Sequence, residues 1–133
     1  ALNVEITLSS EKKISDMIFA IGKLINLESF KFQLNGCITN PRVTKKIIVS
    51  LSELIKKLRK LHELELYLPL SLKNIEKALY RMFYSLGDLI GLEKIQLHFP
   101  YLSYEHYFTE AEMLLHKILS SLPMLYKVNC SFE

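Results

Sequence analysis

The sequence has few of the residues that would indicate a disulfide-rich, fibrous or disordered protein. Its 133 residues include two cysteines, four prolines, four glycines and no tryptophan. Two thiols are too few for the disulfide framework of a small secreted domain, which favours an intracellular protein. Since 50% of the residues are hydrophobic and 23% are charged, the chain has a globular composition. We expect one domain, spanning residues 1–133.

Long hydrophobic runs are also missing. The apolar stretches are interrupted by lysine, glutamate or serine well before the roughly 20 residues that a membrane-spanning helix needs. Residues 1–8 alternate between apolar and polar side chains, whereas a secretory signal has a basic start and a continuous apolar block. We therefore expect no transmembrane segment.

Groups that carry catalytic or metal chemistry are equally sparse. The aspartates, Asp16 and Asp88, both fall in expected helices, and no carboxylate pair ends a strand. The glycines are isolated and form no phosphate-binding loop. None of the four histidines has metal-ligand spacing; they are His62, His98, His106 and His116. We predict a non-enzymatic protein with no catalytic residue, no metal site and no cofactor.

What the sequence does contain is a repeat. Four segments align without a gap, and they read LINLESFKFQL, LRKLHELELYL, LIGLEKIQLHF and LPMLYKVNCSF. They begin at residues 24, 58, 89 and 122, so the spacing is 34, 31 and 33 residues. Each follows the pattern LxxLxxLxLxL, whose three-residue spacing is typical of a helix end and whose alternation is typical of a half-buried strand. Val4, Ile6 and Leu8 supply the strand of an incomplete further unit.

Amphipathic segments between these strands predict four helices. The first is expected over roughly 11–25 and the second over about 41–60, where Asn40 before Pro41 is a strong start signal. We expect the third to open at Ser71 and the fourth at Thr109, which forms a capping box with Glu112.

Each expected strand has a polar face. Glu5 and Thr7 occupy it in the first strand, and the other four strands place Lys31, Gln33, Glu65, Tyr67, Gln96, His98, Asn129 and Ser131 there. A doubly wound sheet would be apolar on both faces, so the pattern favours helices on one side only. Because helices are wider than the strand spacing, the sequence predicts an α/β arc with five parallel strands on its concave face and four helices on its convex face.

The repeats resemble the leucine-rich-repeat family, particularly its long-repeat, ribonuclease-inhibitor-like branch, in which a full helix follows each strand. The family usually places asparagine or cysteine in the turn after the strand. Asn35 matches that position, whereas Pro69, Pro100 and Glu133 replace it in the other units, so the asparagine ladder is absent. The resemblance implies a solenoid that binds a protein partner through its concave face, as an interaction module or adaptor.

The first candidate site is therefore the concave polar strip. It contains Lys31, Gln33, Glu65, Tyr67, Gln96, His98, Asn129 and Ser131. Tyr67 and His98 lie at its middle, and tyrosine combines a large rigid ring with a hydroxyl, which suits an interface anchor. The alternative interpretation is a row of ordinary solvated strand residues.

The second candidate is an aromatic rim loop over residues 100–108, with Tyr101, Tyr104 and Tyr107. These rings either anchor a partner or cover the end of the core.

The third candidate is the basic face of the second helix, formed by Lys45, Lys46, Lys56, Lys57 and Lys60. With a net charge of +3 and a pI near 8.8, this face supports an alternative function. In that alternative, the protein is a structural subunit of a ribonucleoprotein or organellar complex and contacts RNA or an acidic partner. A solvated helix face would show the same pattern.

The last strand has no successor in the sequence. After Phe132 the chain reaches Glu133, which leaves the apolar side of that strand without a capping unit. We expect further repeats of a longer chain, a partner, or self-association to cover this edge.

Overall fold

The computed structural model describes residues 3–8, 14–36 and 38–133. In this part of the chain, strands and helices alternate. The strands are β1 (Asn3–Leu8), β2 (Ser29–Leu34), β3 (Glu63–Tyr67), β4 (Lys94–His98) and β5 (Lys127–Ser131). The helices are α1 (Ile14–Ile21), α2 (Pro41–Lys57), α3 (Glu76–Leu86) and α4 (Phe108–Ser120), with a 3-10 turn, η2 (Leu102–Tyr104), before α4.

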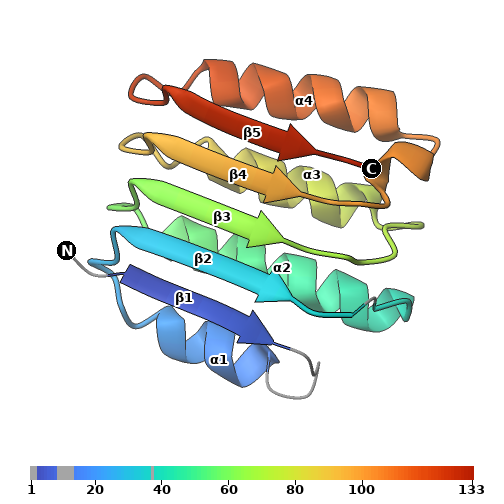
Figure 1. Ribbon diagram of the computed structural model, residues 1–133, viewed down its shortest axis with the longest axis horizontal. Coiled ribbons are helices and arrows are strands. Elements are labelled where there is room, and N and C mark those ends of the chain that lie inside the picture. The colour runs from blue at the N-terminus through green and yellow to red at the C-terminus, as the bar shows by residue number, and fades with distance from the viewer. Residues whose placement is uncertain (1–2, 9–13, 37) are drawn as a thin grey trace.

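The strands form one parallel sheet in the order β1-β2-β3-β4-β5, so each strand pairs with its neighbours in the sequence. Phe30, Leu64, Ile95 and Val128 hold the same position of the repeat, and they are also register partners across the sheet. Figure 1 shows α1 to α4 together behind the sheet, covering one of its faces. The predicted α/β class, with five parallel strands and four helices, is confirmed for the described residues.

The core lies between the sheet and the helix layer. Every apolar position of the repeat in β2, β3 and β4 is buried; these residues are Phe30, Phe32, Leu34, Leu64, Leu66, Leu68, Ile95, Leu97 and Phe99. Helix residues such as Leu51, Leu79 and Leu115 complete the same cluster. A single apolar layer therefore runs through the units from α1 to α4.

The expected start of α2 is confirmed. Asn40 is the residue before the helix, its side-chain oxygen accepts a 3.0 Å hydrogen bond from the N–H of Arg42, and Pro41 occupies the first turn. The helix ends at Lys57, three residues before the predicted end, because Leu58 leaves the helical conformation to enter the next repeat.

Two predicted helix starts are wrong. Helix α3 begins at Glu76 instead of Ser71, because the N–H of Ser71 donates to the carbonyl of Ile38 at 2.8 Å and holds that segment extended beside the previous unit. Helix α4 begins at Phe108, so Thr109 lies inside the first turn and caps nothing. Tyr107 precedes α4, and burial of its ring fixes where the helix starts.

Helix α1 is described over Ile14–Ile21, whereas we predicted roughly 11–25; residues 11–13 lie outside the described part. No helix in the described ranges is both long enough and apolar enough to span a bilayer.

The sheet edge at β5 differs from its interior. Val128 is 51% exposed, although its register partner Ile95 and the equivalent Leu64 are buried. Cys130 and Phe132, which follow Val128 at alternate positions, are only half-buried. Each unit thus leaves one apolar side for a neighbour to cover, and no strand in the described residues covers that of β5.

We predict that Leu66→Ala lowers the free energy of unfolding by about 2–5 kcal/mol, because Leu66 is completely buried in the central strand and its loss leaves a cavity. Met113→Ala is the control, since Met113 is 67% exposed on α4, and it should change stability by about 0.5 kcal/mol or less. Urea denaturation followed by circular dichroism measures both. Equal losses in the two variants would contradict this description of the core.

Candidate functional site

The sheet face opposite the helices, which we call the open face, presents three rows of side chains that cross the strands. One row contains Glu5, Lys31, Glu65, Gln96 and Asn129, and a second contains Thr7, Gln33, Tyr67, His98 and Ser131. All eight residues of the predicted concave strip stand in these two adjacent rows. The parallel register therefore places side chains from four units on one face, although Lys31 and Ser131 are 100 positions apart in the sequence.

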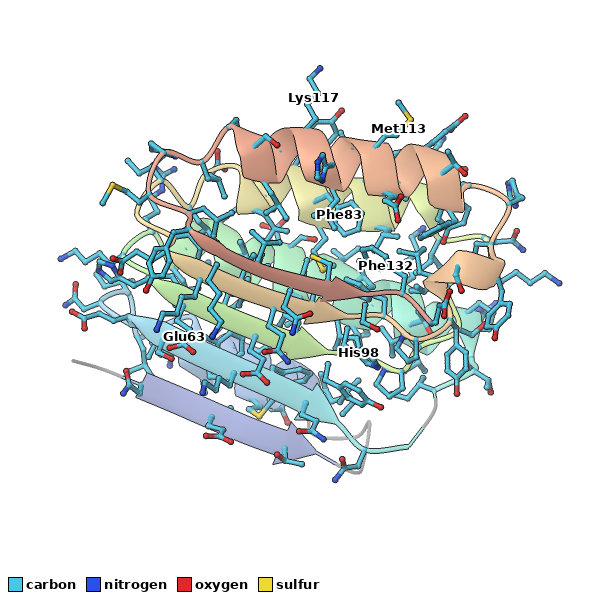
Figure 2. All side chains as sticks on the ribbon, turned by 45° about the horizontal axis from the view of Figure 1, so that its top comes forward. Glu63, Phe83, His98, Met113, Lys117 and Phe132 are labelled. Carbon is cyan, nitrogen blue, oxygen red and sulfur yellow. The ribbon has the colours of Figure 1, made fainter. Side chains whose placement is uncertain are left out.

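The third row was not predicted as part of the site. It contains Asn3, Ser29, Glu63, Lys94 and Lys127, which are the first residues of the five strands. Figure 2 shows Glu63 and His98 near opposite ends of the strands. The three rows together therefore cover the strands from their first residues to their carboxyl ends. Extending the alternation of each strand by one step toward its start would have found this row from the sequence.

An aromatic stack lies on the open face at the carboxyl ends of β3 and β4. The rings of Tyr67 and His98 lie parallel, with centroids 4.6 Å apart and an interplanar angle of 8°. Both side chains are half-buried and come from paired positions of β3 and β4. The next residue of the row is Ser131, which has a small side chain. The stack is therefore a flat apolar platform with a hydroxyl and ring nitrogens at its rim.

Charged groups are unevenly distributed on the open face. The ammonium of Lys31 lies 3.7 Å from a carboxylate oxygen of Glu63 and 3.8 Å from one of Glu65. Lys94 and Lys127 are register partners on β4 and β5, both are exposed, and neither forms an ion pair with a described carboxylate. The start of β4 and β5 is consequently a site of unneutralised positive charge.

The open face is shallow. A depression of about 50 Å³ lies between β3, β4 and β5. Small-molecule sites are usually clefts of roughly 300–1,000 Å³, so this depression fits only one side chain of a partner. A larger hollow of about 530 Å³ lies on the helix side and is lined by Lys56, Lys77, Tyr80, Arg81, Tyr84, Ser85 and Asp88, but it is a wide groove that encloses little.

The three tyrosines of the predicted rim loop differ in exposure. Tyr104 is 78% exposed and Tyr101 is partly exposed, so both remain at the surface. Tyr107 is only 2% exposed; its hydroxyl donates a hydrogen bond to the carbonyl of Leu72 and its ring packs edge-on against Tyr80. Its assignment to the rim is corrected, because Tyr107 belongs to the core and ties the start of α4 to the preceding unit.

The predicted basic face is separate from the open face. Lys45, Lys46, Lys56 and Lys57 are exposed on α2, and Lys60 is exposed in the turn after it. Glu53 reduces the charge at one end of this surface, since its carboxylate lies 3.6 Å from Lys56 and 2.6 Å from Arg81 of α3.

Outside the open face, the described residues include no pair of buried titratable side chains in contact that would suit acid–base or nucleophilic chemistry. His62 meets Glu93 at 3.2 Å, and both side chains are exposed. Burial raises the pKa of the Cys130 thiol, which keeps it protonated and poorly nucleophilic at neutral pH. Cys37 lies outside the described residues. In the described ranges, no group of three or more His, Cys, Asp or Glu side chains could hold a metal ion.

Comparison with known proteins adds no assignment: no family model, no curated protein and no solved structure matches this chain. The function has to be argued from the surfaces themselves. Of these, the open face has the most specific arrangement, because five paired strands hold its side chains in fixed rows.

The Lys31 cluster should contribute little to stability. Its three side chains are more than a third exposed, and exposed ion pairs are typically worth about 0–1 kcal/mol. We predict that Lys31→Met changes the free energy of unfolding by less than about 1 kcal/mol in urea denaturation. Phe32→Ala on the same strand is the control for a buried position and should cost about 3–5 kcal/mol. A large loss with Lys31→Met would show that the cluster is structural.

Tyr107 should make the fold sensitive to alkali. Burial raises the pKa of Tyr107, and burial together with Glu76 and Glu110 raises that of Tyr80 from 10.0 to about 12. Both phenols hold their protons more tightly in the folded chain than in the unfolded one. Their contribution to stability is thus complete below pH 10 and declines as the pH rises above it.

We predict that Tyr107→Phe costs about 1 kcal/mol at pH 8, because the hydrogen bond to Leu72 is lost. The variant should also lose less stability than the wild type between pH 9 and 11. The free energy of unfolding, measured across that range, checks both expectations, and identical pH slopes would contradict the second.

Proposed function

We propose that this protein is a leucine-rich-repeat arc of the long-repeat, ribonuclease-inhibitor-like type, and that it acts as a non-catalytic protein-interaction module or adaptor. The observation that carries this proposal is the stacked Tyr67–His98 platform at the carboxyl ends of β3 and β4, on a polar sheet face whose opposite face is covered by helices. The sequential strand order and the helix layer on one side support the arc, because helices about 10 Å across cannot match strands about 4.8 Å apart without curvature.

The open face is suited to binding because it is preorganised. Its side chains stand on strands that are hydrogen-bonded in register to their neighbours, so few backbone degrees of freedom are lost when a partner docks. Tyr67 and His98 already restrain each other by stacking. An aromatic pair of this kind offers a large contact area at low entropic cost, which is the usual character of an interface anchor.

The charges indicate which partner would fit. Lys94 and Lys127 complement an acidic group, whereas the platform complements an apolar or aromatic side chain. The two features lie about four residues apart along the strands, or about 13 Å. We therefore expect the partner to present an acidic side chain and an apolar anchor at about this separation.

The alternative function, a structural subunit that contacts RNA or an acidic partner through Lys45, Lys46, Lys56, Lys57 and Lys60, is supported by the exposure of these lysines. It is weakened by Glu53, which neutralises part of the charge. This alternative also leaves the aromatic stack of the open face without a role.

Affinity capture from cells that make the protein, followed by calorimetry with the purified partner, tests the proposal. We expect the double variant Tyr67→Ala/His98→Ala and the single variant Lys94→Glu each to weaken binding by at least about 10-fold. Tyr84→Ala is the matched control, because Tyr84 is an exposed tyrosine on α3 of the helix layer. Its affinity should equal that of the wild type.

Two results would refute the proposal: unchanged affinity in both open-face variants, or loss of binding only in Lys56→Glu/Lys57→Glu/Lys60→Glu. The second result would favour the alternative. If the partner is RNA, affinity should also fall steeply between 50 and 200 mM salt.

A further inference from the structure

Among the described residues, no strand pairs with the outer hydrogen-bonding edge of β5. The N–H of Lys127 donates to the carbonyl of Glu93, and the carbonyl of Ser131 accepts from the N–H of Phe99, so these residues turn their backbone groups toward β4. Backbone groups of successive strand residues point to opposite sides. Val128 and Cys130 consequently direct their N–H and C=O groups away from β4, where no strand of the described residues lies (Figure 1).

The side chains of this edge are apolar on the helix side. Val128 is 51% exposed, whereas Cys130 and Phe132 pack partly against the core. An occupant therefore has to supply two things: strand backbone for the free N–H and C=O groups, and apolar side chains on the face that adjoins the helices.

The sequence of this edge is complementary to itself when it is read in the opposite direction. In an antiparallel pairing centred on Cys130, Lys127 faces Glu133 of a second copy, Val128 faces its Phe132, and Asn129 faces its Ser131. Opposite charges meet at both ends, and apolar residues meet apolar residues. Cys130 then faces its own equivalent.

We infer that β5 pairs antiparallel with β5 of a second copy of this chain, joining the two five-stranded sheets into one continuous sheet. The two-fold axis runs perpendicular to the sheet, which places both helix layers on the same side and makes the interface isologous. The two Cys130 residues exchange N–H···O=C bonds across the axis, and the carbonyl of Val128 accepts from the N–H of Phe132 of the second copy. The carbonyl of Phe132 takes no part in the pairing, because it accepts from the N–H of Ser103 on the β4 side of the strand.

The pairing of Lys127 with Glu133 allows the dimer to be tested by exchanging charges. Sedimentation velocity of the 133-residue chain should show a species of twice 15.5 kDa. We expect Lys127→Glu alone and Glu133→Lys alone each to raise the dimer dissociation constant by about 10-fold, because like charges then meet at both ends. The combined variant Lys127→Glu/Glu133→Lys should restore the wild-type value. Lys77→Glu, an exposed lysine on α3, is the control and should change nothing.

A second variant tests the apolar contact. Val128→Asp should raise the dissociation constant by more than about 100-fold, because it places a charge between apolar residues at the new junction. Since Val128 is half exposed in the single chain, the variant should keep the circular dichroism spectrum of the wild type. If Val128→Asp unfolds instead, the Lys127 and Glu133 variants still test the dimer, because they alter only exposed or edge side chains.

Covalent trapping locates the centre of the pairing. Directly opposed residues of a hydrogen-bonded antiparallel pair have Cα atoms about 5.5 Å apart, within the range of a disulfide. In a Cys37→Ser background, oxidised glutathione at mildly alkaline pH should link the two Cys130 thiols, which give up two protons and two electrons to the oxidant. A monomer up to about 100 µM, a dimer that ignores both the charge exchange and Val128→Asp, or no Cys130 crosslink in an otherwise dimeric sample would each overturn the inference.

Discussion

Each unit of this protein has an apolar side that it cannot cover by itself. The leucines of β3 are buried because β2, β4 and the helices behind them supply the missing neighbours. At β5 the same repeat position, Val128, loses that protection and becomes half exposed. Stacking of units in parallel register is therefore the constraint on which the rest of the structure depends, since it closes the core and also aligns the polar rows.

The open face is a direct result of that stacking. Because the register advances by whole repeats, equivalent residues such as Lys31, Glu65 and Gln96 fall side by side although they belong to different units. Variation at one repeat position is thereby converted into a row of different side chains on a regular sheet. The Tyr67–His98 stack is one outcome of this arrangement, and the pair of exposed lysines at the start of β4 and β5, Lys94 and Lys127, is another.

The repeat predicted the strands, the alternation of their apolar and polar residues, and the residues of two of the three rows on the open face, because alternation and burial are local properties of each strand. Helix starts were predicted well only where capping was local, as at Asn40 and Pro41. At Ser71 a hydrogen bond to Ile38 of the previous unit overrides the local signal, and at Thr109 the buried ring of Tyr107 does so. The stacking of Tyr67 on His98 and the burial of Tyr107 depend on contacts 31 and 35 residues apart, which no local pattern contains.

The strand order β1-β2-β3-β4-β5 has a consequence for how the molecule opens. Units that touch only their sequence neighbours behave as a one-dimensional chain, in which the ends can open without disturbing the middle. Amide protons of β3 then exchange only when all the units on one side of this strand unfold, whereas those of the two outer strands exchange by local fraying. Protection against hydrogen exchange should form a gradient that peaks at the strand carrying Tyr67, so the least mobile part of the fold supports the aromatic stack of the open face.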